Sequence, residues 1–266
     1  MSDPAISVRN VIVSYGGRRV LDGINLDVKR GETMVLLGGS GSGKSTLLRQ
    51  IIGLEQPQSG QIMVNGIDFS TRNRKELKKL HRSMGVAFQD AALFDSMSLE
   101  DNVALPLREL TSLDESTIRL MTWMKLSVVG LAEFGKLSPQ ALSGGMKKRA
   151  AVARALALDP EILVFDEPSA GLDPIVAAEL DELILALKRA FNITILVVTH
   201  EMASAFRIAD RMAMLYKGSL ITVGTKEELQ ASSHPRIRQF LDRVPDPILE
   251  SANHQILERY VEGGAL

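Results

Sequence analysis

The sequence predicts an α/β fold: a three-layer core with an N-terminal antiparallel β subdomain and a mainly helical subdomain. Short, almost wholly apolar runs at residues 33–37, 162–165 and 194–198 are typical of parallel strands buried on both faces. A helical pattern at residues 174–190 separates the last two runs. Alternation of buried strands with helices indicates a sheet that is covered by helices on both faces.

The remaining elements follow in chain order. Strands are expected at residues 6–15 and 25–28, in the N-terminal sheet, and at 60–65 and 84–88. A helix should follow the buried strand at 45–52, and the chain becomes helical from 98 to 157. Within that stretch, residues 116–129 predict a helix whose apolar residues lie roughly on one face: Ile118, Met121, Trp123, Met124 and Val128.

The last strands and the domain boundaries can also be predicted. Residues 211–216 and 219–223 predict a hairpin that turns at Lys217 and Gly218. Prolines at positions 235, 245 and 247 indicate a boundary near the end of the chain. We therefore expect one domain over residues 1–244, with its helical subdomain at about 90–157, and a C-terminal tail at 245–266 that docks on a partner subunit or is disordered.

Composition excludes several classes of protein. The 266 residues carry a formal net charge of −1, so there is no global basic field for nucleic acid or anionic lipid. The chain has no cysteine, which excludes disulfides and cysteine-ligated metals. No apolar run approaches the roughly 18 residues of a membrane helix, and the first ten residues do not resemble a secretory signal. If the protein works at a membrane, we expect another chain to span it.

A glycine-rich segment after the strand at 33–37 has the spacing of a phosphate-binding loop. Its residues fit the pattern G-x-x-x-x-G-K-[ST] between a strand and a helix. The backbone N–H groups of such a loop converge on phosphates, Lys44 would reach the β- and γ-phosphates, and the Ser45 hydroxyl would bind Mg²⁺. A flexible Gly/Ser turn is the alternative. The nucleotide-binding residues expected here are Gly38, Gly39, Ser40, Gly41, Ser42, Gly43, Lys44, Ser45 and Thr46.

Two acids end the apolar strand at 162–165. Carboxylates at the end of a buried strand are costly unless they have partners or a chemical role. Asp166 is placed to hold Mg²⁺ through water, and Glu167 is placed to act as general base on an attacking water. The alternative is two solvated turn acids before Pro168, and the nearby phosphate loop argues against it.

A second glycine-rich turn, Leu142-Ser143-Gly144-Gly145-Met146 (the signature turn), has no task in a lone nucleotide site. Together with the phosphate loop it suggests ATP held between two protein surfaces. The order of these motifs resembles that of the ABC ATPases over residues 6–243. The resemblance implies two copies that meet head to tail, so that Ser143, Gly144 and Gly145 contact the γ-phosphate of ATP held by the other copy's Lys44.

The resemblance also assigns roles to four further residues. Tyr15 would stack on adenine, although it could be an ordinary exposed turn residue. Gln89 would contact Mg²⁺ and the attacking water. His200, which ends the strand at 194–199, would contact the γ-phosphate, although a lone histidine is more often structural. Asp173 would lie in a loop, residues 169–173, that crosses the dimer interface.

One departure from the family pattern narrows the resemblance. Met146 occupies a place where glutamine is most common, and this resembles the lipid-transport branch. Residues 91–107 and 234–242 are similar to the Mla-type ATPases of Gram-negative bacteria. These use ATP and Mg²⁺ to move phospholipids between the inner and outer membranes. The resemblance implies a second copy, a multipass permease, a periplasmic MCE-domain protein and a cytoplasmic STAS-domain protein. The chain would sit on the cytoplasmic face of the inner membrane, with no nucleic-acid partner.

Several alternatives remain at this point. Residues 91–97 would line the groove for the permease, or else form a routine loop packed on its own core. The chain could belong to another ABC importer or exporter. A nucleic-acid or ribosome-associated ABC ATPase is disfavoured by the single cassette and the lack of cysteine and heptads. A soluble phosphotransferase would leave the signature turn, Gln89 and His200 without a role.

Overall fold

The computed structural model describes residues 3–69 and 73–244, which form two β-sheets with helices around them. The chain divides into two compact units between residues 226 and 227, and both sheets belong to the first unit. The predicted docking tail at 245–266 lies outside the described residues. Within the described part, no helix is long and apolar enough to cross a membrane.

The smaller sheet is antiparallel, as predicted, and has the strand order β2-β1-β4-β5. Gly16 and Gly17 make the tight turn between the first two strands, with φ of 55° and 80°. The predicted strand at 25–28 was too short, because β2 begins directly after this turn. In its first six residues only Leu21 is buried, so this half of the outer strand carries too little apolar pattern to predict it. The strands are β1 (Ile6–Tyr15), β2 (Arg18–Val28), β4 (Ser59–Val64) and β5 (Ile67–Asp68).

The larger sheet has the order β10-β9-β3-β8-β7-β6, and all its neighbouring strands are parallel except the β9–β10 hairpin. Every residue of β3 and β8 is buried, which confirms the predicted central strands. Lys217 and Gly218 turn the final hairpin with φ of 46° and 83°, also as predicted. The strands are β3 (Thr33–Leu37), β6 (Met84–Ala87), β7 (Ile162–Asp166), β8 (Thr194–Thr199), β9 (Arg211–Tyr216) and β10 (Ser219–Thr225).

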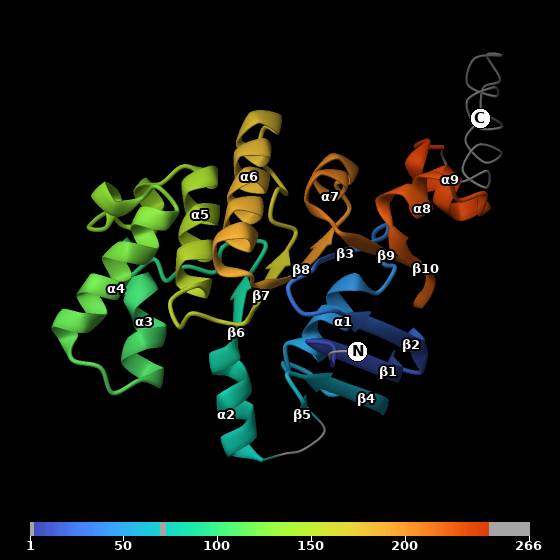
Figure 1. Ribbon diagram of the computed structural model, residues 1–266, viewed down its shortest axis with the longest axis horizontal. Coiled ribbons are helices and arrows are strands. Elements are labelled where there is room, and N and C mark those ends of the chain that lie inside the picture. Colours follow the sequence, from blue (N-terminus) through green and yellow to red (C-terminus); the bar gives the residue numbers. More distant parts are fainter. Residues whose placement is uncertain (1–2, 70–72, 245–266) are drawn as a thin grey trace, which may run out of the picture. The chain divides into compact units, whose positions relative to one another are not determined.

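Helices and the antiparallel sheet cover the two faces of the larger sheet. On one face lie α6 (Pro174–Phe191) and α7 (Met202–Ile208), and on the other α1 (Lys44–Ile51) with the antiparallel sheet (Figure 1). Buried side chains of α1 join the two sheets in one continuous hydrophobic core. This confirms the three-layer prediction. The mostly polar helix α2 (Arg74–Ser83) was not predicted; it is anchored by the buried Leu80.

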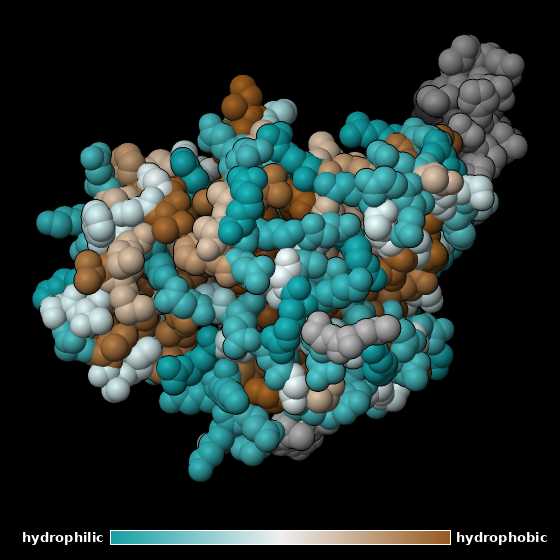
Figure 2. All heavy atoms as spheres, viewed as in Figure 1, coloured by the Kyte–Doolittle hydropathy of each residue, from teal (hydrophilic) through white to brown (hydrophobic). Residues whose placement is uncertain are grey.

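The helical subdomain contains α3 (Leu99–Leu110), α4 (Glu115–Val128) and α5 (Gly144–Ala155), with short 3₁₀ turns at Ala132–Phe134 and Pro139–Ala141. The predicted apolar face of α4 was only partly right: Ile118 is buried and Met121 packs against the same small hydrophobic cluster, but the other three residues are not in the core. Trp123 is 58% exposed, and Met124 and Val128 are also exposed. The buried face instead follows Ile118, Thr122 and Leu126, and the polar Thr122 hides this stripe from an apolar count. Figure 2 shows hydrophobic residues gathered over this subdomain, on the left.

The second unit contains the short helices α8 (Lys226–Gln230), which begins at the boundary, and α9 (Pro235–Leu241). The ring of His234 caps α9 by accepting a hydrogen bond from the backbone N–H of Arg236. Arg238 donates to the carbonyl of Gln230 at 3.2 Å and pairs with Asp242 at 2.9 Å. Local polar contacts therefore hold this unit together.

Candidate active site

Four loops that carry predicted site residues meet at one edge of the larger sheet. Because β3, β6, β7 and β8 are parallel, the residues after each strand emerge on the same side. Leu37, just before the phosphate loop, is opposite Thr199, just before His200. The carboxyl edge of such a sheet is where α/β proteins bind ligands. The fold thus brings the phosphate loop, Gln89, the two acids and His200 to one crevice.

The phosphate loop has a backbone that only glycine tolerates at two positions. Gly43, the residue before α1, has φ of 109°, and a Cβ there would lie 2.8 Å from Leu21 Cδ2. A Cβ on Gly38 would lie 2.4 Å from the carbonyl oxygen of Leu215. The loop folds around the Lys44 ammonium, which donates to the carbonyls of Gly38 at 2.7 Å and Gly39 at 3.3 Å.

The buried Lys44 is held close to negative charge. Its Nζ lies 4.0 Å from Glu167 Oε1, and the side chains are only 9% and 11% exposed. Burial lowers the pKa of Lys44, and the carboxylates of Glu167 and Asp166 oppose that shift. An ammonium in this position is poorly compensated by solvent, so a polyphosphate would improve its environment.

Glu167 connects Lys44 to His200. Its Oε2 accepts a hydrogen bond from the backbone N–H of His200 at 3.3 Å and lies 2.9 Å from Nδ1 of the same residue. The backbone N–H of Glu167 donates to the carbonyl oxygen of Val198 at 2.8 Å. Its φ of 46° is a left-handed conformation that is uncommon for residues other than glycine. Held on both sides, this carboxylate is suited to accept a proton from a water molecule at the sheet edge.

Asp166 offers an oxygen for a cation. Its Oδ1 is buried and has no hydrogen-bond partner, and burial followed by the charge of Glu167 raises its pKa. The exposed Ser45 places a hydroxyl at the first turn of α1. Among the described residues, no cluster of three or more His, Cys, Asp or Glu forms a metal cage. The residues therefore fit a cation that takes few protein ligands and several phosphate or water oxygens, as Mg²⁺ does.

The signature turn starts α5. Ser143 caps this helix, its Oγ accepting from the backbone N–H of Met146 at 3.3 Å. A Cβ on Gly145 would lie 2.5 Å from Val176 Cγ1 on α6, whereas one on Gly144 would meet only Leu172, at 3.7 Å. Figure 1 places α5 and α1 on different sides of β7, so the signature turn belongs to another part of the molecule than the phosphate loop.

Tyr15 and Asp173 also make contacts within the chain. The Tyr15 hydroxyl donates to Glu55, which raises the pKa of Tyr15, while the residue remains 46% exposed. Oδ1 of Asp173 accepts from the backbone N–H groups of residues 175 and 176, both at 3.0 Å, and so caps α6. The exposed ring of Tyr15 is free to stack on a base, and Asp173 has a structural role whatever else it contacts.

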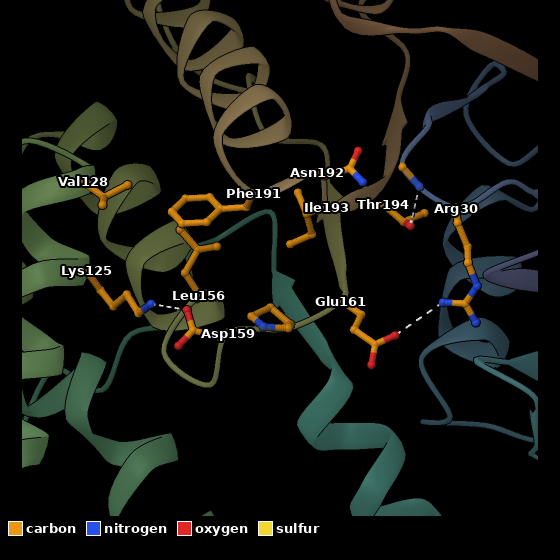
Figure 3. Close-up of a pocket in the computed structure, with 12 residues that line it drawn as sticks. Arg30, Lys125, Val128, Leu156, Asp159, Glu161, Phe191, Asn192, Ile193 and Thr194 are labelled. Atoms are coloured by element: carbon orange, nitrogen blue, oxygen red, sulfur yellow. Dashed lines mark hydrogen bonds and ion pairs between the residues drawn. The ribbon is translucent and has the colours of Figure 1, made fainter.

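A cavity of about 430 Å³ lies at the opposite edge of the sheet (Figure 3). It is lined by residues that precede β7 and β8, together with α4 and the end of α6. Its cations are already paired, Arg30 with Glu161 at 3.4 Å and Lys125 with Asp159. None of the predicted nucleotide residues lines it, so it is separate from the candidate active site.

Comparison with known proteins identifies the family. The model of the ABC transporter domain matches residues 21–170. The chain belongs to the ABC transporter family. Solved ABC cassettes share its fold: cbiO1 of Clostridium perfringens, part of the cbiONQ complex, has a TM-score of 0.80 at 32% identity and covers 91% of this chain and 98% of its own. The dimeric cassette MJ0796 with ADP and phosphate bound has a TM-score of 0.75 at 30% identity, covering 83% and 98%.

Two groups of ABC relatives resemble about nine tenths of the chain. The probable ribonucleotide transport ATP-binding protein mkl of Mycobacterium leprae is 45% identical over 238 residues, which cover 90% of this chain and 69% of the relative. The intermembrane phospholipid transport ATP-binding protein MlaF of Escherichia coli K12 is 42% identical over 241 residues, covering 91% and 90%. This ABC protein is therefore an ATP-hydrolysing enzyme, as predicted.

Sequence reasoning missed two cations in this ABC cassette. Lys148 and Arg154 on α5 donate to backbone carbonyls of the loops that hold Gln89 and Glu167. Gln89 itself is exposed and its backbone carbonyl accepts from Lys148. No sequence signal separated these cations from their basic neighbours Lys147 and Arg149, because their partners are main-chain atoms.

Proposed function

We propose that this chain is the ATP-hydrolysing subunit of an inner-membrane ABC transporter that moves phospholipids between the inner and outer membranes. One observation carries the phospholipid assignment: the 42% identity to MlaF covers about nine tenths of both chains, so no large part of either is unmatched. Met146 in the signature turn and the segment at 91–107 had suggested the same branch.

The site residues divide the work of hydrolysis among them. The phosphate-loop N–H groups and Lys44 bind the phosphates, and the exposed ring of Tyr15 stacks on the base. Ser45, Gln89 and Asp166 would hold Mg²⁺, and the bound ion would neutralise charge at the phosphate oxygens. Glu167 accepts the proton of the attacking water.

His200 and a second copy of the chain complete the site. His200 holds Glu167 through its ring and its backbone N–H, and contacts the γ-phosphate. The signature turn of the second copy, with Ser143, Gly144 and Gly145, closes over the nucleotide, and Asp173 lies in the shared interface. The separation of α1 from α5 within one chain supports this head-to-tail arrangement.

A permease partner is supported by the loop after Gln89. Phe94 is 51% exposed, yet its backbone is fixed by the fully buried Asn102, which accepts from its N–H at 2.8 Å and donates to its carbonyl at 3.0 Å. A rigid loop that presents an exposed aromatic ring suits a protein interface. We place the chain on the cytoplasmic face of the inner membrane through this contact, with MCE-domain and STAS-domain proteins in the same assembly.

Mass spectrometry of the detergent-extracted complex tests this function. We expect a multipass membrane protein and phospholipids to co-purify with the tagged chain, above the level found with a mock-tagged control strain. Bound ribonucleotides other than ATP and ADP, without phospholipid enrichment, would instead favour the cargo named for the mycobacterial relatives. Recovery without any membrane protein would contradict the proposal.

A further inference from the structure

Two cations on α5 hold four backbone carbonyls of the active-site loops. The ammonium of Lys148 donates to the carbonyl of Gln89 and, at 3.1 Å, to that of Glu167. One turn and a half further along the helix, the Arg154 guanidinium donates to Ala92 at 2.6 Å and to Ala91 at 2.8 Å. We name Lys148 and Arg154 the carbonyl clamp. One rigid helix therefore holds the loop after β6 and the loop after β7 together.

The loops that the clamp holds are strained. Ala91, Ala92 and Glu167 have φ of 60°, 51° and 46°, in the left-handed region that costs a non-glycine residue about 1–2 kcal/mol. Such a backbone persists only where its surroundings fix it. The clamp supplies charge-assisted hydrogen bonds at or beside each strained residue, and these are stronger than bonds between neutral groups. Loss of the clamp should let these loops relax away from the geometry shown here.

Lys148 lies on the same helix as the signature turn. It is four residues after Gly144, one helical turn along α5, and so moves with the start of that helix. Burial lowers the pKa of its ammonium, while the carboxylates of Asp90, Asp166 and Glu167 favour the charged form. The side chain thus reaches inward from α5 into the acidic part of the active site.

From these contacts we infer that Lys148 is a positioning residue: it couples docking of the signature turn to the placement of Gln89 and Glu167. This rests on the proposed function, in which the signature turn binds ATP of a second copy. When α5 moves to meet that nucleotide, the carbonyls of Gln89 and Glu167 move with it. The Glu167 carboxylate, held by His200, then shifts with its backbone as the two copies close. Arg154 keeps the rest of the Gln89 loop attached to the same helix.

Steady-state ATP hydrolysis by the purified complex tests this coupling. Lys148→Met keeps a long unbranched side chain but removes its charge and its hydrogen-bond donors. Lys147→Met is the matched control one residue earlier. We expect Lys148→Met to lower kcat by about 10- to 100-fold, the order of loss for a misplaced catalytic group. The KM for ATP and the thermal midpoint should stay close to those of Lys147→Met. Lys148→Arg, which retains donors, should recover most of kcat.

A second arm separates positioning from mere support of the fold. In a Glu167→Gln background, Lys148→Met should cause little further loss, since a residue that acts through Glu167 has nothing left to place. Independent, multiplicative losses would overturn the inference, and so would equal kcat for the Lys148→Met and Lys147→Met complexes. The inference would also be overturned if Lys148→Met lowered both kcat and the thermal midpoint and Lys148→Arg recovered neither. The cargo of the complex is read separately, so a failed phospholipid assignment would leave this test unaffected.

Discussion

Gly145 should be required by packing as well as by nucleotide contact, and Gly145→Ala separates the two. The added Cβ would lie 2.5 Å from Val176 Cγ1, closer than real Cβ contacts come, and the β-branched Val176 cannot rotate freely on a helix. Overpacking of this kind costs about 1–3 kcal/mol. The gain in helix propensity is at most about 1 kcal/mol. We therefore expect a net loss of about 1–2 kcal/mol of unfolding free energy.

Urea unfolding of four variants measures this effect: Gly145→Ala, Gly144→Ala, Val176→Ala and the double variant Gly145→Ala with Val176→Ala. Gly144→Ala is the matched control, because its Cβ would meet Leu172 at an ordinary 3.7 Å and should leave stability unchanged or slightly higher. In the double variant Gly145→Ala with Val176→Ala the space is restored, so the coupling between the two changes should be about 1 kcal/mol or more. Additive losses, within about 0.3 kcal/mol, would refute the packing argument. If the double variant is stable but hydrolyses ATP poorly, the remaining defect belongs to nucleotide contact.

Three further changes test the nucleotide residues. Asp166→Asn should raise the thermal midpoint of the ATP-free protein at pH 7 while abolishing Mg²⁺-dependent hydrolysis. Because the pKa of Asp166 is raised in the folded protein, the wild type loses stability as pH rises above the ordinary pKa of 3.8. The difference in thermal midpoint between the two proteins should therefore vanish below that pH. Equal thermal midpoints for the two proteins at pH 7 would contradict the claim that the buried Oδ1 of Asp166 lacks a hydrogen-bond partner. Tyr15→Ala should weaken ATP binding about 10-fold by calorimetry, and Tyr15→Phe, which keeps the ring, hardly at all; equal weakening would rule out stacking. Lys44→Ala should reduce nucleotide binding in the same assay, and unchanged binding would remove the phosphate-loop assignment.

The central sheet and its site were accessible from sequence because burial and chemistry coincide there. Runs such as residues 33–37 and 194–199 are apolar on both faces, and the parallel fold places whatever follows them at one edge. Lys44, Glu167 and His200 therefore meet as expected. The contact between Glu167 and His200 is a property of three-dimensional placement, which the spacing of the motifs allowed but did not specify.

The predictions of β2 and α4 were partly wrong because polar residues take part in both elements. β2 is an outer strand, and in its first half only Leu21 is buried, so an apolar pattern found only its end, where buried and more exposed residues alternate. On α4, the buried Thr122 belongs to the core face, whereas the larger Trp123 and Met124 face solvent. In such a case, a count of apolar residues assigns the buried face to the wrong side of the helix.

Contacts from cations to main-chain carbonyls were beyond sequence reasoning. Asp173 caps α6 through two backbone N–H groups, a role that an aspartate directly before Pro174 does signal, whereas Lys148 and Arg154 bind backbone carbonyls. Any residue offers the same backbone groups, so no sequence pattern shows which cation reaches them. The steric limit on Gly145 likewise depends on the approach of α6.

Nucleotide trapping by Glu167→Gln in the purified complex tests most directly whether Glu167 is the base of a shared site. We expect turnover to fall by roughly 100-fold or more, while each chain still binds one ATP and the two chains stay together as a closed pair. Adding Lys44→Ala to the same chain should release that nucleotide. Turnover near that of the wild type, or ATP retained by single unpaired chains, would contradict the claim that Glu167 is the base of a site shared between two copies.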